Sequence, residues 1–496
     1  MMSLVLFIVI PLAAAFLIAL LGRHIKNIGD VVTNLVGLGL FSLSIFAAME
    51  VLSGKSIIYH LGGWPGPLGI SLVADGFTAL MLVAVNLVGC AVLVYSLGYM
   101  VTYTDKWNFQ ALFMLMLAGL NGALLSSDIF NLYIFLELVS IAAYVLVAFS
   151  TEAESMEASF RYVIMGSLAS AFILLGIAAI YSYTSTLSFA GIAASLAEKP
   201  DWLLMRFVLV LFIAGFGLKA AVVPFHAWLA DAHSSAPSPV SAMLSAVVIK
   251  TLGVYALVRI IFNVLGVSDA VLSVFMVLGI FSMVAGAFLA ISQNDIKRMF
   301  AYSSVSQIGY IIFAFGIGTP LAIAGGLLHL FNHAVLKSLL FLSAGSIEYA
   351  TRKRDLNSLG GLKDKLPVTW GNSLVGSLGV SGIPPLGGFW SKLVIIIAAI
   401  ETGRIAFSLI AVLVSIVTLA YYMKFQGQVF FGKMSEAYDR VKEASFTMKL
   451  AMSVLALVSV FSGLLLIPSL RPFLGMAVNS LWPAVSQGTM VSGALR

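Results

Sequence analysis

Long apolar runs alternate with short polar connections along almost the whole chain. A helix needs about 20 apolar residues to cross a bilayer, and runs of that length predict about fourteen membrane-spanning helices. The connections between them are too short to hold a soluble catalytic domain, and the Gly- and Pro-rich residues 54–69 are predicted to form an extramembrane loop. We place the spans at 3–22, 31–53, 74–101, 108–126, 129–150, 160–184, 203–231, 238–263, 270–292, 297–318, 320–349, 367–400, 405–431 and 446–468.

Composition places the chain among membrane proteins. Of its 496 residues 61% are hydrophobic and 10% are charged, and the mean hydropathy is +1.06. Soluble domains carry about 25% charged residues. We therefore predict an all-α polytopic membrane protein, and the net charge of +6 bears on orientation in the membrane rather than on nucleic-acid binding.

Basic residues near the helix ends predict the orientation of the chain. Most loop lysines and arginines fall on the side of Arg23 and Lys297, and the side richer in Lys and Arg is normally cytoplasmic. Both termini are then predicted to lie on the outer side of the cell membrane. The first apolar run has no basic flank before it, so we interpret it as a retained helix rather than a cleaved signal. The single cysteine, Cys90, excludes a disulfide within the chain and is interpreted as a small buried residue.

Two of the predicted spans are interrupted by proline. Pro224 divides the first, and Pro384 with Pro385 divides the second. A proline inside a helix removes a backbone hydrogen bond and kinks or unwinds it. The freed carbonyl groups must then face protein or water, because lipid cannot satisfy them. Trp228 and Trp390 each follow the proline by a few residues.

The two breaks occupy matching places. Each is in the fourth helix of a five-helix block, one at 108–263 and the other at 270–431. Paired interruptions of this kind indicate a transporter built from repeats. We divide the chain into three N-terminal helices (1–107), the two blocks, and a segment 432–496 that holds a cytoplasmic loop, the last helix and a C-terminal tail.

Four lysines inside predicted spans need an explanation: Lys219, Lys250, Lys337 and Lys392. A lysine near the bilayer centre costs at least about 2.5 kcal/mol on insertion scales, so it usually faces the interior of the bundle or a hydrated path. The alternative for Lys219 and Lys250 is that they snorkel to the interface. We favour a path for ions or protons, because an inert anchor has no reason to carry these charges.

Glu137 is a carboxylate within an apolar helix, and helical spacing places Tyr133, Ser140 and Tyr144 near its face. Burial raises the proton affinity of a carboxylate, whereas a nearby ammonium group lowers it. A Glu–Lys pair that opens and closes could therefore gate proton movement. The alternative is a fixed ion pair that holds helices together.

His329, His333 and Lys337 recur at every fourth residue and form a titratable stripe on one helix face. Such groups can act as neighbouring stations for protons. A metal site lacks a third ligand, and a b-type haem would need histidines on opposite sides of the ring. His226 at the first break is a further candidate station, with a hydrogen-bonded structural role as the alternative, and the same alternative applies to His233.

Other polar residues leave two interpretations open or favour a structural one. The hydroxyl and amide groups near the start of the tenth span could line a hydrated path or bridge helices by hydrogen bonds. Asp75 and Asp128 lie at helix ends, where capping is the expected role. The residues with both interpretations open are Ser303, Ser304, Ser306 and Gln307.

Residues from about 112 to 430 strongly resemble the antiporter-like membrane subunit family. This family comprises the D subunits of Mrp-type sodium/proton antiporters, the matching subunits of membrane-bound hydrogenases and sulfane reductases, and the large proton-pumping subunits of respiratory complex I. The resemblance implies fourteen helices, two inverted five-helix repeats with broken seventh and twelfth helices, and a central polar axis. The motifs that carry it are FNLYIFLELVSIAAY, GLKAAVVPFHAWLADAHSSAPSPVSAML, SQNDIKRMFAYSSVSQIGY, HLFNHAVLKSLLFLSAGSI and GIPPLGGFWSK.

The resemblance also assigns residues. Glu137 matches the glutamate of the fifth helix and Lys219 the lysine of the seventh, which are viewed in the family as an interacting pair. Lys250 matches the lysine of the eighth helix, and Lys392 the lysine or glutamate that ends the twelfth. The polar eleventh helix of the family corresponds to His329, His333 and Lys337.

We therefore expect a proton-translocating member of a multisubunit complex in the cell membrane, equivalent to the D subunit of an Mrp-type Na⁺/H⁺ antiporter. The alternative is the equivalent component of a redox-driven complex. Its partners would be other membrane subunits, and sodium exchange would need them because this chain has no cluster of carboxylates. No cofactor is expected, since no contact for quinone or haem is evident, and a catalytic redox site would lie on other chains.

Overall fold

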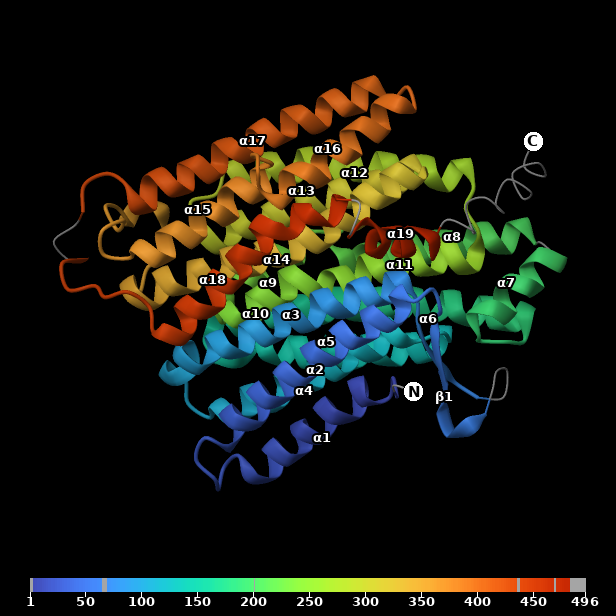
Figure 1. The fold of residues 1–496 in the computed structure, drawn as a ribbon, viewed down its shortest axis with the longest axis horizontal. Helices are drawn as coiled ribbons and strands as arrows, with labels where there is room; N and C mark the ends of the chain where they lie inside the picture. Colours follow the sequence, from blue (N-terminus) through green and yellow to red (C-terminus); the bar gives the residue numbers. More distant parts are fainter. Residues whose placement is uncertain (1–2, 65–68, 200, 435–437, 468–469, 482–496) are drawn as a thin grey trace.

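The computed structural model describes residues 3–64, 69–199, 201–434, 438–467 and 470–481, and the chain forms a bundle of helices that run roughly along one axis (Figure 1). The first part of the bundle contains α1 (Leu6–Leu21), α2 (Ile28–Leu52), α3 (Gly76–Tyr99), α4 (Lys106–Leu125), α5 (Ile129–Val147), α6 (Ala153–Thr184), α7 (Phe189–Glu198) and α8 (Trp202–Ala220). The middle part contains α9 (Ala227–Ser235), α10 (Ser238–Met243), η4 (Leu244–Val248), η5 (Lys250–Tyr255), α11 (Ala256–Ile260), η6 (Ile261–Leu265), α12 (Asp269–Ile291), α13 (Ile296–Ile317) and α14 (Pro320–Thr351). The last part contains α15 (Pro367–Ser381), α16 (Gly387–Glu401), α17 (Ile405–Phe430), α18 (Phe446–Phe461) and α19 (Arg471–Asn479).

Among the described residues, 12 helices are long and apolar enough to cross a membrane. They match twelve of the predicted spans. The two other predicted spans correspond to α1, a shorter apolar helix, and to the broken pair α15 and α16. The chain is therefore an all-α polytopic membrane protein in its membrane part, as predicted.

Several elements outside the spans were not predicted. Residues 57–60 of the expected loop form strand β1 (Ile57–His60), which pairs antiparallel with β2 (Ser71–Ala74) just before α3. The short helices α7 and α19 were also missed. Helix α6 begins at Ala153, seven residues before the predicted start, because the polar first turn is helical as well. Single-turn 3₁₀ segments occur at η1 (Leu61–Gly63), η2 (Met100–Thr102), η3 (Ala148–Ser150), η7 (Leu356–Ser358) and η9 (Ser462–Leu466).

The core of the bundle lies along α3, α4, α13, α14 and the helix of residues 238–265. These helices are buried on nearly all sides, whereas α2, α17 and α18 bury about a third of their length and expose Leu and Ile outward. A helix that is buried all round needs apolar residues on every face, apart from groups that have partners inside. The polar residues of these central helices are therefore the ones whose contacts decide the function.

Both predicted helix breaks are confirmed. The first helix ends at Ala220 and resumes at Ala227, and the second ends at Ser381 and resumes at Gly387. Carbonyl groups near the breaks obtain side-chain donors. The indole Nε1 of Trp228 donates to the carbonyl oxygen of Leu218 (3.1 Å), and that of Trp390 donates to Pro385 (3.1 Å). The two tryptophans noted in the sequence thus serve the same purpose at both breaks.

The helix of residues 238–265 is wound as π-helix over much of its length. The π-helical segments are Leu244–Val248, Lys250–Tyr255 and Ile261–Leu265. In a π-helix the hydrogen bonds run over five residues, and such stretches often occur at functional sites. Gly253 lies in the middle segment, and a Cβ there would clash with the backbone of Ala220. This close approach brings Lys250 and its helix against the end of α8.

Candidate functional site

Glu137 and Lys219 form an ion pair beside the first break. The Nζ atom of Lys219 lies 3.2 Å from Oε1 of Glu137 and donates to the hydroxyl of Ser140 (2.8 Å). Ser170 on α6 also donates to Oε1 of Glu137. The Lys219 side chain is 3% exposed and that of Glu137 is 27% exposed, so the lysine is enclosed while its partner reaches the edge of the bundle. Lys219 therefore does not snorkel to the interface.

Lys250 is fully buried in the π-helical segment. Its Nζ donates to the carbonyl oxygen of Ser245, five residues earlier, at 2.5 Å. Within the described chain no carboxylate lies within ion-pairing distance of it. The hydroxyl of Ser245 in turn lies 2.7 Å from that of Ser304 on α13. The ammonium group is thus solvated by neutral dipoles of the protein rather than by an opposite charge.

Lys337 lies at the centre of α14 and also has only neutral partners in the described structure. Its Nζ donates to the carbonyl oxygen of Phe300 (2.8 Å), to the hydroxyl of Ser303 and to that of Tyr422 (3.1 Å). The rings of Phe300 and Tyr422 lie 5.7 and 5.8 Å from Nζ, close enough for cation–π attraction. Sequence reasoning missed Tyr422, although a tyrosine inside a span is a recognisable signal because its hydroxyl needs a partner.

The two histidines of α14 stack on each other, with ring centroids 6.0 Å apart. His329 lies 2.9 Å from the Ser391 hydroxyl through Nδ1 and 3.2 Å from Oε1 of Gln307 through Nε2. Neither ring nitrogen of His333 has a hydrogen-bond partner among the described residues. The predicted stripe therefore exists. Both ring nitrogens of His329 have hydrogen-bond partners, whereas those of His333 have none among the described residues.

Lys392 lies on α16, shortly after the second break. Its Nζ is 3.3 Å from the hydroxyl of Ser415 and 4.6 Å from the centre of the Tyr310 ring. The hydroxyl of Tyr310 is itself bound to Ser415 (2.9 Å) and to the carbonyl oxygen of Ala411 on α17. Ser391, the residue immediately before Lys392, contacts His329. The second break and the histidine stripe are therefore joined.

One backbone carbonyl links two of the lysine sites. The oxygen of Phe300 accepts from Nζ of Lys337 (2.8 Å) and from the hydroxyl of Ser304 (2.9 Å), which is 2.7 Å from Ser245. Ser303 and Ser304 thus bridge helices, and Ser306 does the same by donating to the carbonyl oxygen of Met283 (2.9 Å). The structure therefore favours the bridging interpretation for these serines.

Other candidates are not brought into the same network. No hydrogen bond joins Lys219 to Lys250 in the described chain, although their helices are in contact. His226 is half-buried at the start of α9, with its ring 6.2 Å from that of Tyr302. Asp75 and Asp128 cap α3 and α5, as predicted. Asp75 also forms an unpredicted ion pair with the buried Arg259 (2.7 Å).

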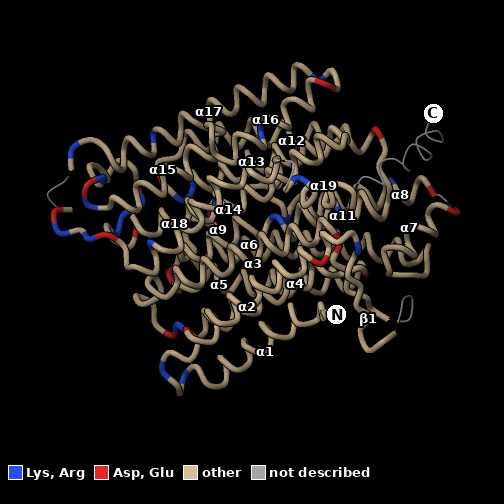
Figure 2. Tube along the Cα trace, viewed as in Figure 1, with Lys and Arg blue, Asp and Glu red and all other residues tan. Residues whose placement is uncertain are grey.

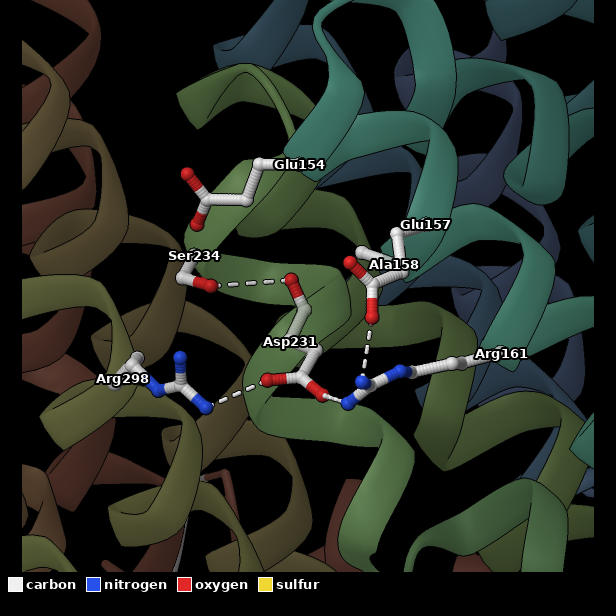
Figure 3. A pocket seen from close by; sticks show the side chains of 7 residues that line it. All are labelled: Glu154, Glu157, Ala158, Arg161, Asp231, Ser234 and Arg298. Atoms are coloured by element: carbon white, nitrogen blue, oxygen red, sulfur yellow. Dashed lines mark hydrogen bonds and ion pairs between the residues drawn. The ribbon is translucent and has the colours of Figure 1, made fainter.

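Charged residues gather at one end of the bundle, around the loops at the left of the view (Figure 2). Asp231 on α9 binds Arg161 on α6 (2.7 Å) and Arg298 on α13 (2.5 Å), and Figure 3 shows these side chains converging on a cavity of about 250 Å³. Nearby, burial raises the pKa of the Asp295 carboxyl, although Arg354 opposes this. The ion pairs of Asp231 were missed because each partner lies at the end of a predicted span, where charge is ordinary.

Lys297 also lies at this end, and its position corrects the sequence analysis. The sequence places it among the loop cations, but it is in the first turn of α13, is 2% exposed and pairs with Glu348 at 2.5 Å. Among the described residues there is no group of three or more His, Cys, Asp or Glu side chains arranged to hold a metal ion. The buried lysines are thus each paired with a carboxylate or with neutral dipoles.

Comparison with known proteins identifies the family. The model of the NADH:quinone oxidoreductase/Mrp antiporter transmembrane family matches residues 126–418. A second model, the N-terminus of complex I chain 5, matches residues 66–110. The chain belongs to the NADH:quinone oxidoreductase/Mrp antiporter family. The matched region contains every lysine, histidine and glutamate of the candidate path.

Members of the family from both functional branches are similar to this chain. The N subunit of the NADH-quinone oxidoreductase of Desulforudis audaxviator is 37% identical over 85% of each chain, and the D subunit of the Na⁺/H⁺ antiporter of Alkalihalophilus pseudofirmus is 30% identical over 91% of each. Among solved structures, a chain of the Mrp complex from Dietzia sp. matches with a TM-score of 0.90 at 27% identity and 99% coverage of both chains. A chain of an archaeal membrane-bound sulfane sulfur reductase matches with a TM-score of 0.88 at 29% identity, over 98% of this chain and 99% of the other.

Proposed function

We propose that this chain is a proton-translocating subunit of a multisubunit membrane complex. The observation that carries the proposal is the series of enclosed lysines on the central helices, which begins with the ion pair of Lys219 and Glu137. Lys250, Lys337 and Lys392 follow, each solvated by hydroxyl or carbonyl groups. Such groups are costly inside a membrane, and moving a proton along them is a function that requires them.

In this proposal a change of charge at one site alters the proton affinity of the next. Two unit charges interact strongly at short range in a low-dielectric interior, so neighbouring sites titrate as coupled groups. Opening the pair of Glu137 and Lys219 would change the charge near Lys250. The stripe of His329, His333 and Lys337 would carry the change to Lys392, which exchanges protons with one side or with a neighbouring subunit. His226 is the weakest candidate, because no hydrogen bond in the described part of the chain ties it to this series.

The arrangement of the chain in the membrane is part of the proposal. Helix α1 begins and α18 ends at the end of the bundle opposite the main group of charged loops (Figures 1 and 2). With the positively charged side in the cytoplasm, both termini would lie outside. We also propose that 108–263 and 270–431 are inverted repeats. The matching places of the two breaks support this division.

Two kinds of complex are candidates for the partners. The relatives named as D subunits of Na⁺/H⁺ antiporters support an Mrp-type sodium/proton antiporter, in which sodium transport would need other subunits. The second candidate is a redox-driven complex. It is supported by the 37% identity to the NADH-quinone oxidoreductase relative and by the likeness to the sulfane sulfur reductase. Mass spectrometry of the subunits that co-purify with the chain distinguishes them. Small hydrophobic antiporter subunits indicate the first, and iron–sulfur subunits indicate the second.

Substitution of Lys219 by alanine tests the translocation role directly. We expect membrane vesicles that carry the assembled complex to lose proton transport, measured with a pH-sensitive dye, because the pair at the first break is gone. Complex assembly, followed by native gel electrophoresis, should be largely retained. Full transport by the variant would refute the role of Lys219, and loss of assembly would support the structural ion pair instead.

A further inference from the structure

The chain contains a second enclosed Lys–Glu pair, which resembles the first in its construction. Nζ of Lys297 lies 2.5 Å from Oε2 of Glu348, and the hydroxyl of Ser238 donates to the same oxygen at 3.3 Å. The Lys297 side chain is 3% exposed and that of Glu348 is 25% exposed. As with Lys219 and Glu137, the ammonium group is buried, the carboxylate reaches the surface, and a serine supports it.

This pair lies where a cavity meets the interior of the bundle. Glu348 and Lys297 both line a cavity of about 410 Å³ at the charged end, together with Asp295, Lys353 and Arg354. A water molecule occupies about 30 Å³ in the liquid, so a polar cavity of this size can hold several. Glu348 is thus in reach of water, while its partner is enclosed by protein.

On the inner side of the pair lies His233, which is fully buried. Its ring stacks on that of Phe341 at 4.7 Å, one helical turn beyond Lys337 on α14. Neither of its ring nitrogens has a hydrogen-bond partner among the described residues. Nζ of Lys297 donates to the carbonyl oxygen of Ala236, three residues after His233. An imidazole buried without partners is costly unless it has a task, and imidazole can both accept and release a proton.

Helix α13 connects the same groups from another side. Lys297 is one turn before Phe300, whose carbonyl oxygen accepts from Lys337 at 2.8 Å. The ring of Phe300 packs edge-on against that of Phe341 at 5.8 Å. His233 thus lies on α9, which packs against the helix of Lys297, and its ring packs on α14, the helix of Lys337.

We propose that Glu348 and Lys297 form a proton entrance from the charged end, and that His233 passes protons from this pair to Lys337. The proposal rests on the proposed proton-translocating function and adds an entry route to its second half. The residues of the route come from three helices, α9, α13 and α14, so the entrance exists only in the folded chain.

The proton balance of one passage is simple. The ammonium of Lys297 releases a proton to His233, which becomes an imidazolium, and His233 passes that proton to the neutral amine of Lys337. The neutral amine of Lys297 is then recharged from the cavity through the carboxylate of Glu348. One proton has moved inward, no bond between heavier atoms has changed, and the pair returns to its starting charge.

Other charged groups face these residues and set their field. Arg354 lies 3.8 Å from Oε1 of Glu348 and 3.5 Å from Asp295. The cations that act on His233 are Lys337, Lys250 and Lys297, on three different helices. A proton that enters from the cavity therefore meets a region already rich in ammonium groups, so its passage requires one of them to be neutral.

Substitution of Glu348 by glutamine in the whole complex tests the entrance. Proton flux would be measured in inverted membrane vesicles, whose charged cytoplasmic end faces the medium, over a range of external pH. We expect flux to fall at least about tenfold at alkaline pH, where protons are scarce and a collecting carboxylate matters most, and less at acidic pH. E348D should restore most of the flux, because it keeps the carboxylate.

Three further variants make the test decisive. K433Q removes an exposed charge at the same end of the bundle but outside the cavity and should leave flux nearly unchanged. E348Q combined with K297M removes the pair without leaving a buried charge alone, so the complex should assemble and flux should still fall. H233F should lower flux at every pH without altering assembly.

The outcomes separate the entrance from the proposed function. If E348Q and the double variant assemble and keep normal flux while Lys219→Ala abolishes it, the entrance is overturned and the translocation role stands. An equal loss of flux at all pH values in E348Q, without rescue by E348D, would also overturn it. If Lys219→Ala keeps normal flux as well, the proposed function itself fails.

Discussion

The two broken helices place a lysine in similar surroundings but neutralise it differently. At the first break Lys219 meets the carboxylate of Glu137 at 3.2 Å, whereas at the second Lys392 meets only a serine hydroxyl and the face of Tyr310 within the described chain. Both lysines are nearly fully buried. A charge held by an opposite charge and a charge held by dipoles respond differently to the loss of a partner. The breaks thus supply similar backbones for two different electrostatic sites.

The difference has a consequence for proton movement. The first site can be switched by separating two charges, which alters the field at the neighbouring lysines. The second has no carboxylate partner among the described residues, so the cost of burying its charge can be relieved by giving the proton away. We therefore expect the first site to act as the gate and the second as the point of release.

Removing the acid at the first site should produce the largest effect. Glu137→Gln leaves the ammonium of Lys219 enclosed without its charged partner, and breaking a buried pair from one side costs about 3–5 kcal/mol at full burial, less here because Glu137 is partly exposed. We expect both thermal stability and proton flux to fall. E137Q combined with K219M should recover the melting temperature but not the flux. Recovery of the flux in the double variant would contradict the gating role.

Removing the lysine at the second site should affect transport alone. Lys392→Met keeps the length of the side chain and leaves no carboxylate without a partner, so we expect an unchanged or slightly higher melting temperature. Proton flux should still fall by about tenfold or more, because a titratable station is lost. A melting temperature that drops as far as in E137Q would show that the two sites do not differ as described.

The hydroxyl of Tyr310, whose ring lies under the ammonium group of Lys392, provides a test of the same site with a smaller expected effect. Tyr310→Phe keeps the ring under the ammonium group and removes the hydrogen bonds to Ser415 and Ala411. We expect a loss of about 1–3 kcal/mol in stability, as for two hydrogen bonds, and a change in flux of a few fold. Tyr255→Phe removes a buried hydroxyl away from the break and is the matched control, with stability lowered and flux nearly normal. Equal changes in flux for the two variants would remove Tyr310 from the site.

The tryptophans at the breaks should give the smallest effect. Trp228→Phe leaves the carbonyl of Leu218 without its indole donor in a buried place, whereas Trp390 is 37% exposed. We expect Trp228→Phe to lower the free energy of unfolding by about 1–3 kcal/mol and Trp390→Phe to lower it by less. Thermal unfolding of the purified complexes compares them. Equal losses would mean that the two breaks depend on these donors to the same degree.

Much of this architecture followed from the sequence alone. Apolar runs of about 20 residues located the helices, because a bilayer imposes that length. Proline located the two breaks, because it cannot donate a backbone hydrogen bond. The positions of Glu137 and the four lysines within these runs marked them as candidates, since charge inside a membrane needs a reason.

Contacts between distant segments were decided only by the tertiary structure. Lys297 and Glu348 lie at helix ends in the sequence, where charge is common, and only the packing of α13 against α14 encloses one of them. Tyr422 and Ser415 became partners of the lysines because α17 packs against the other helices of the second block. The π-helical winding around Lys250 depends on how that helix is packed on all sides. The sequence determined that the four lysines inside the spans must be buried, and the tertiary structure decided which of them has an acid for a partner, because that depends on distances between helices that no local pattern encodes.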